Sequence, residues 1–192
     1  MIDPNDPNYR KKDHRMLGIG LTVGAALLIA YACVSHRWLE NTQFEGAFIG
    51  FSLLSFEACM NDTCETKSNS DVMAEAKRRR SEHASSVFAP AGIATLVLLG
   101  ISALALLATA AVAWTRKRPK LAVPPQTVAL LTIMLALLAG CAFIGTKPGG
   151  IGAVGVGIGF WAFGIGSVLG IAGAQILAKM IKPIDPDLPA EL

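Results

Sequence analysis

The chain has 192 residues, of which 53% are hydrophobic and only 16% are charged. Its net charge of +3 is too small for the basic surface typical of a nucleic-acid-binding protein, so we expect no nucleic acid among its partners. The hydrophobic residues are gathered into four long blocks, which excludes an ordinary soluble domain.

Each block exceeds the length of about 18 residues that a helix needs to cross the hydrocarbon core of a lipid bilayer. The sequence therefore predicts an all-α membrane protein, folded as a four-transmembrane-helix bundle. The expected spans are residues 16–34, 87–115, 127–145 and 151–178. The other segments are an N-terminal tail (1–15), a loop (35–86), a connector (116–126), a tight turn (146–150) and a C-terminal tail (179–192).

Prolines predict where helices are interrupted. Pro4 and Pro7 disfavour helix at the residues before them, so we expect an extended N-terminal tail. Pro124 and Pro125 likewise predict a non-helical connector, and Pro90 predicts a kink where the second span begins. A basic tail before an apolar run is also typical of a signal peptide, but this run is long for one, and we interpret it as a retained helix.

Lysine and arginine residues beside the spans indicate the orientation, because cytoplasmic loops are enriched in them. The N-terminal tail and the connector each carry four Lys/Arg residues, and the C-terminal tail carries Lys179 and Lys182. We therefore expect both termini in the cytoplasm and the long loop outside, in a plasma membrane or a bacterial inner membrane. Against this orientation stands an outer basic cluster just before the second span, which comprises Lys77, Arg78, Arg79 and Arg80.

Part of the loop is expected to be helical. Residues 71–77 are rich in helix formers, and Ser70 or Asp71 is expected to cap the helix. We expect that this helix can continue into the second span. Asn61 begins an Asn-X-Thr sequon, which marks a glycosylation site in organisms that glycosylate.

Small residues recur along the fourth span and form one helix face, on which a neighbouring backbone can approach closely. Their expected role is packing inside the four-helix bundle. The alternative is a docking face for another membrane protein or a second copy of the chain, because one bundle can bury only part of so long a stripe. The stripe comprises Gly152, Gly155, Gly159, Ala162, Gly166, Gly170 and Gly173.

Between their ends the four spans contain no Asp, Glu, Lys, Arg or His. Pumps, proton-coupled transporters and intramembrane hydrolases are usually marked by such residues, so we expect no enzyme and no cofactor. His36 and His83 lie near the two ends of the loop, and we interpret them as ordinary interfacial histidines rather than metal ligands.

On the expected topology all four cysteines lie at or near the outer, oxidising side, where disulfides persist. A bond between Cys59 and Cys64 would close a tight loop. Cys33 and Cys141 are either bridged to each other or buried as small residues, and the second interpretation is preferred.

The loop contains a spaced motif: Trp38 follows soon after the first span, Leu54 and Phe56 come before Cys59, Cys64 is the second cysteine, and the basic residues 78–80 lead into the second span. With this motif the loop resembles the first loop of the claudin/PMP22-like tetraspan superfamily. The resemblance implies a small extracellular β-sheet, held by a disulfide and anchored on the bundle by a tryptophan. It also implies a non-enzymatic role in adhesion or as an auxiliary subunit.

Three functions are consistent with these features. The leading hypothesis is a structural or auxiliary subunit of a larger membrane complex, acting through helix packing and the outer loop. Its expected partners are other membrane protein subunits or a second copy of the chain. The alternatives are a claudin-like adhesion or barrier protein, and a membrane thiol oxidoreductase that cycles Cys59 and Cys64 against Cys33 and Cys141.

Overall fold

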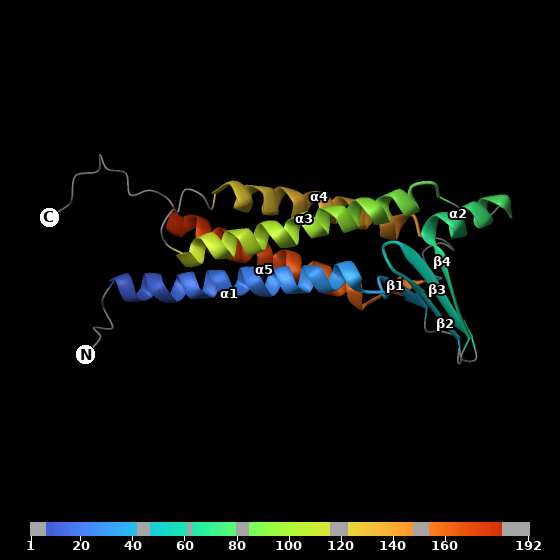
Figure 1. The fold of residues 1–192 in the computed structure, drawn as a ribbon, viewed down its shortest axis with the longest axis horizontal. Helices are drawn as coiled ribbons and strands as arrows, with labels where there is room; N and C mark the ends of the chain where they lie inside the picture. The colour runs from blue at the N-terminus through green and yellow to red at the C-terminus, as the bar shows by residue number, and fades with distance from the viewer. Residues whose placement is uncertain are drawn as a thin grey trace.

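The computed structural model describes residues 7–41, 47–60, 63–79, 85–115, 123–147 and 154–181. Four long helices lie side by side, and a small sheet with a short helix stands at one end of them (Figure 1). The helices are α1 (Pro7–Val34), α2 (Asn69–Arg78, the short one), α3 (Phe88–Thr115), α4 (Val123–Gly145) and α5 (Ile158–Ile181). The strands are β1 (Leu39–Asn41), β2 (Ala47–Phe51), β3 (Ser55–Met60), β4 (Thr63–Ser68) and β5 (Gly155–Val156).

The four long helices confirm the number of apolar spans predicted from the sequence. Each is long and apolar enough to cross a membrane. The candidate membrane segments are Arg15–Val34, Phe88–Thr115, Pro124–Gly145 and Ile158–Ala178.

The described strands form one antiparallel sheet in the order β4-β3-β2-β1-β5. Strands β1 to β4 come from the loop that follows α1 and pair mostly with their neighbours in sequence. The fifth strand comes from the segment before α5 and pairs with β1. The sheet therefore joins the loop after α1 to the segment before α5. The small sheet that the family resemblance implies is therefore present.

Two helices begin earlier than predicted, because proline is tolerated in the first helical turn, where its missing N–H would have no partner. α1 begins at Pro7, so the prediction of an extended tail is wrong from that residue on. α4 begins at Val123 and takes Pro124 and Pro125 into its first turn, which shortens the predicted non-helical connector. Pro90 also lies in a first turn, that of α3, where it breaks no helical hydrogen bond and requires no kink.

The fourth long helix begins later than predicted. α5 starts at Ile158 rather than at residue 151, because Gly155 and Val156 pair with β1 as an edge strand. The predicted direct passage from a tight turn into the span is therefore wrong. Gly155 is a strand residue and not a helix-packing residue, and Gly152 lies outside the described residues.

α2 is a separate helix and does not continue into α3, since residues 85–87 are not helical. Its N-cap is Ser68, whose Oγ accepts a hydrogen bond from the Asp71 N–H at 3.1 Å. The predicted cap at Ser70 or Asp71 is therefore two or three residues late.

The bundle core is apolar, with hydroxyl groups that bond to the backbone. Thr95, Ser102 and Thr109 lie on one face of α3, and each donates to the carbonyl four residues earlier at 2.7–2.8 Å. Ser102 Oγ also lies 2.8 Å from Thr132 Oγ1 of α4. Gln126 Nε2 of α4 donates to a carbonyl of α5 at 2.9 Å. Hydrogen bonds of this kind between apolar helices are modest in strength, but they fix the helix register.

Candidate functional site

The described residues 35–41, 47–60, 63–79 and 154–157 form a unit at one end of the bundle, called the head below (Figure 1). It consists of the sheet, α2 and the turns between them. Because the four apolar spans contain no Asp, Glu, Lys, Arg or His between their ends, the head holds most of the charged side chains in the described part of the chain.

Trp38 fixes the head to the bundle. Its side chain is fully buried, and its Nε1 donates a 2.6 Å hydrogen bond to the Ala32 carbonyl in the last turns of α1. The indole packs against Phe143 of α4 and against Phe160 and Phe163 of α5, with ring centroids 5.7–6.2 Å apart. One side chain at the start of the head thus contacts three of the four long helices, which is the position expected of an anchor.

Backbone contacts hold the head at two further points. The Leu53 carbonyl lies against Gly92 of α3, where any Cβ would overlap its oxygen. The Gly159 N–H, in the first turn of α5, donates to the Arg37 carbonyl at 2.9 Å, and a Cβ at the preceding Gly157 would overlap that same carbonyl. At both points only glycine allows the backbone of the head to approach so closely.

The two other predicted anchors differ in their outcome. Phe56 of β3 packs on Phe51 with ring centroids 4.8 Å apart, and Phe51 in turn packs on Phe88 of α3 at 5.5 Å. Leu54 is 49% exposed, whereas Leu53 is only 1% exposed. The prediction that Leu54 is an anchor is therefore wrong, because neighbouring side chains in this turn point to different sides of the chain.

Cys59 of β3 and Cys64 of β4 are directly opposite each other, and their Sγ atoms lie 2.08 Å apart, the distance of a disulfide bond. In the described part of the chain, these two residues and Glu57 form the one group close enough to hold a metal ion. Metal ions bind cysteine as the thiolate, so two sulfurs that are bonded to each other do not supply ligands. The group is therefore a cross-link between two strands and not a metal site.

The other two cysteines are free thiols. Cys33 is half-buried in α1 and Cys141 is exposed on α4. They are not bridged to each other, and the preferred expectation of buried small residues fits neither of them fully.

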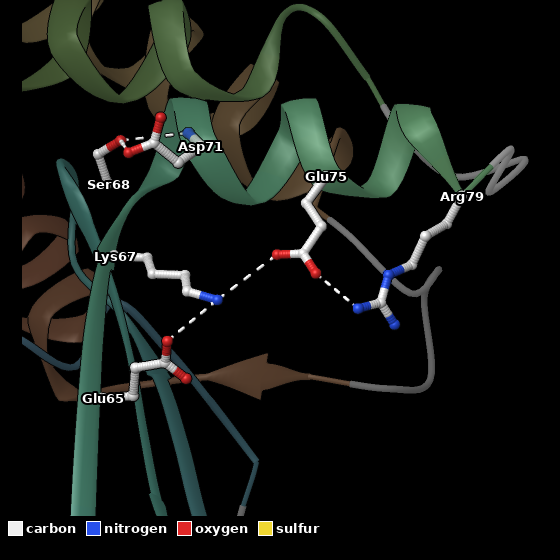
Figure 2. A network of polar contacts seen from close by, with 6 residues as sticks. All are labelled: Glu65, Lys67, Ser68, Asp71, Glu75 and Arg79. Atoms are coloured by element: carbon white, nitrogen blue, oxygen red, sulfur yellow. Dashed lines mark hydrogen bonds and ion pairs between the residues drawn. The ribbon is translucent and has the colours of Figure 1, made fainter.

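A chain of ion pairs joins β4 to α2 (Figure 2). Lys67 Nζ lies 3.1 Å from a carboxylate oxygen of Glu65 and 3.5 Å from one of Glu75. Arg79 lies 2.6 Å from the other carboxylate oxygen of Glu75. Glu75 of α2 is thus held from two sides, by the sheet and by the end of its own helix.

These contacts shift the protonation of two side chains. The hydrogen bond from Arg79 and the positive charge of Lys67 hold the pKa of Glu75 below its usual value. The hydrogen bond to Glu65 and the negative charges of Glu65 and Glu75 raise the pKa of Lys67. Exposed ion pairs add little to folding stability, so we interpret this network as setting the orientation of α2 on the sheet.

The first turn of α2 is tied to the sheet by Asn69, which is 2% exposed. Its N–H donates to the Leu54 carbonyl at 3.0 Å, and its Nδ2 donates to the Ser52 carbonyl at 3.1 Å. Just before it, Ser68 Oγ lies 2.6 Å from a carboxylate oxygen of Asp71 (Figure 2). The start of α2 is therefore fixed by the hydrogen bonds of the buried Asn69, and its end by exposed ion pairs.

The predicted outer basic cluster does not act as one unit. Arg79 is paired with Glu75. Lys77 and Arg78 are exposed on α2, and Lys77 lines a cavity next to α3. Arg80 lies outside the described residues.

The small residues of α5 are covered by the chain's own helices. A Cβ at Gly173 would lie 2.6 Å from Thr22 Oγ1 of α1. Glycines 159, 166 and 170 are also within contact distance of α1 or of the segment after it, with Gly170 contacting α3 and α4 as well. These glycines are therefore occupied by packing inside the bundle, as expected, and do not provide the docking face considered as the alternative.

Several residues that position the head escaped prediction. Gly92 lies in a long apolar run with one other glycine, Gly100, and nothing in the sequence separates the two. Gly157 lies in the predicted span 151–178, where the sequence does not distinguish it from the helix glycines. The ion pair between Glu75 and Arg79 has the helical spacing of four residues that favours such pairs, and this signal could have found it.

Comparison with known proteins adds no assignment. No protein-family model matches the chain, and no curated protein matches it.

Proposed function

We propose that this chain is a multi-pass membrane protein without catalytic activity, which serves as an auxiliary subunit and presents its head to a partner membrane protein. The observation that carries the proposal is the attachment of the head. Buried Trp38, the Gly92 contact and the hydrogen bond from the Gly159 N–H of α5 to the Arg37 carbonyl fix its position on the bundle. A binding surface works best when rigid elements hold it in one orientation.

The composition of the long helices supports a role in binding rather than in chemistry. Their apolar spans contain no Asp, Glu, Lys, Arg or His between their ends, and such residues usually mark transport and catalysis inside membranes. The claudin/PMP22-like resemblance of the first loop points the same way. Under this proposal the termini face the cytoplasm and the head lies outside.

Adhesion between membranes is the less favoured function. A protein that adheres through its sheet needs an open edge to pair with another chain. Glu65 and Lys67 place charges on the edge strand β4, and charged edge strands resist such pairing. The opposite edge, β5, is only two residues long.

The test is the size of the assembly in native membranes. The full chain, tagged at its C-terminus, is cross-linked in the membranes of its source and separated by native electrophoresis in a mild detergent. We expect a species well above the 20.1 kDa monomer. Wild-type protein that migrates only as a monomer would overturn the proposal.

Two tryptophan variants show whether the head carries the contact. Trp38→Ala removes the buried anchor, and we expect the larger species to be lost while the helix content measured by circular dichroism is kept. Trp161→Ala is the matched control, because this tryptophan is 61% exposed on α5, and we expect its complex to survive. Equal loss in both variants would argue against the head as the contact surface.

Orientation is tested separately by labelling. Ser70→Cys places a thiol on the exposed side of α2, which a membrane-impermeant maleimide in intact cells should modify. Wild-type protein controls for labelling at the free cysteines Cys33 and Cys141. Labelling of Ser70→Cys only after the cells are opened would place the head in the cytoplasm.

A further inference from the structure

A cavity of about 400 Å³ lies between α2 and the first turn of α3. One part of its wall is apolar and includes Met73, Ala74 and Pro90. The other part is polar and includes Lys77, Ser85 and Ser86. The cavity therefore combines one cation and hydroxyl groups with an apolar floor.

Lys77 is the charged residue of this cavity. In the described part of the chain it forms no ion pair, and no carboxylate belongs to the cavity wall. The nearby carboxylate of Glu75 is already held by Lys67 and Arg79. A lysine ammonium and serine hydroxyls are hydrogen-bond donors that suit a phosphate group.

The cavity continues into an apolar ridge on α3. From Pro90 in the cavity wall, steps of three or four residues lead along one face of the helix. The large side chains of this ridge are 41–70% exposed, so the rest of the bundle does not cover them. They are Ile93, Val97, Ile101 and Leu104. A cavity with hydrogen-bond donors that suit a phosphate thus stands at one end of an apolar helix face.

We propose that the cavity binds the headgroup phosphate of an anionic phospholipid, whose acyl chain lies along the ridge of α3. An anionic lipid is favoured over a zwitterionic one, because the quaternary ammonium of phosphatidylcholine would be repelled by Lys77. The inference rests on the proposed function only in that α3 crosses the membrane with its first turn at the surface. It does not depend on a partner protein.

The test uses the purified full chain in a neutral detergent, with native mass spectrometry as the readout. Phosphatidylglycerol and phosphatidylcholine with identical acyl chains are titrated separately. We expect phosphatidylglycerol to bind about tenfold more tightly, because both lipids offer the same phosphate and only phosphatidylcholine brings a second cation close to Lys77. Equal binding of the two lipids would overturn the proposal.

Three variants locate the site. Lys77→Gln should lower the affinity for phosphatidylglycerol about tenfold. Arg78→Gln removes the same charge one residue further along, outside the cavity wall, and should leave the affinity unchanged. Ala74→Phe keeps every charge but fills the cavity, and it should weaken binding as strongly as Lys77→Gln.

Other outcomes would contradict the site. Equal losses in Lys77→Gln and Arg78→Gln would show attraction by overall charge, and unchanged binding in Ala74→Phe would place the lipid elsewhere. Binding of inorganic phosphate with the affinity of the lipid would assign the cavity to a free anion. The lipid assay needs no partner protein. If the protein forms the larger species in native membranes but does not prefer phosphatidylglycerol, only the lipid site is rejected. A monomer in native membranes that still binds the lipid rejects the auxiliary-subunit proposal alone.

Discussion

Gly92 of α3 has no room for a side chain, because the carbonyl oxygen of Leu53 occupies the place of a Cβ. This contact seats the turn between β2 and β3 directly on the helix. It lies beside the aromatic cluster of Phe51, Phe88 and Phe143, in which the rings of Phe88 and Phe143 are stacked at 4.4 Å. The head is thus supported at the end of α3 as well as through Trp38.

We therefore expect Gly92→Ala to destabilise the attachment of the head. The added methyl group forces either the turn or the helix to move, and overpacking of this kind costs about 1–3 kcal/mol. The measurement is the midpoint of thermal unfolding in detergent. Gly100→Ala, on the same helix, is the control, because nothing lies within 4 Å of a Cβ there. Equal stability of the two variants would contradict the tight seat at Gly92.

A second pair of glycines tests the contact between α1 and α5. Gly173→Ala would bring a Cβ to 2.6 Å from Thr22 Oγ1 and 3.1 Å from the Gly18 carbonyl, both on α1. We expect a loss of about 1–3 kcal/mol in the free energy of unfolding, because two helix backbones must separate. Gly164→Ala lies on the same helix with nothing within 4 Å, and it should be neutral. Denaturant titration of both variants in the same detergent gives the comparison.

Residue patterns predict the bundle well because hydrophobic length alone identifies the spans. Helix starts are harder to predict, because a proline such as Pro7 or Pro124 disfavours the residue before it and yet fits the first turn of a helix. The predicted start of α5 is wrong for a different reason. Gly155 and Val156 look like part of an apolar span, and only their pairing with β1, more than 100 positions away, makes them a strand.

In the head, too, sequence patterns predict some residues correctly and miss others. The spaced motif includes Trp38 and Cys59, of which Trp38 is fully buried and Cys59 is bonded to Cys64. Leu54 was selected by its place in the motif, but the turn exposes it and buries Leu53. Gly92 contributes by the absence of a side chain, which leaves no pattern to read. Contacts between distant backbone segments are decided by the tertiary fold, and a single sequence does not encode them in local spacing.

Removal of the disulfide tests whether it is structural or catalytic. The cysteines are five positions apart. Closing so short a loop lowers the entropy of the unfolded chain and raises its free energy by about 2 kcal/mol. We expect the Cys59→Ser/Cys64→Ser double variant to show faster hydrogen exchange in β3 and β4, with the long helices unchanged. A Cys33→Ser/Cys141→Ser variant is the control for loss of thiols in general. If the protein oxidises dithiol substrates and the first variant abolishes this activity, the thiol oxidoreductase hypothesis replaces the proposed function.

The ion pairs between β4 and α2 predict how the head responds to pH. The pKa of Glu75 is lower in the folded protein than its ordinary value of 4.5, so its contribution is present above that value and is lost as the pH falls through the folded pKa. The pKa of Lys67 is higher than its ordinary value of 10.5, so its contribution is present below that value and is lost as the pH rises through the folded pKa. The attachment of α2 should therefore be strongest on a plateau between the two ordinary values.

Hydrogen exchange of the α2 amides, corrected for the intrinsic pH dependence of exchange, measures this plateau. We expect protection to fall at the acidic end, and Glu75→Gln should remove that fall while lowering protection on the plateau. Glu40→Gln is the matched control, because Glu40 lies on β1 outside the network. In this variant the fall of protection at acidic pH should be unchanged. If protection still falls at acidic pH in Glu75→Gln, another carboxylate holds α2 on the sheet.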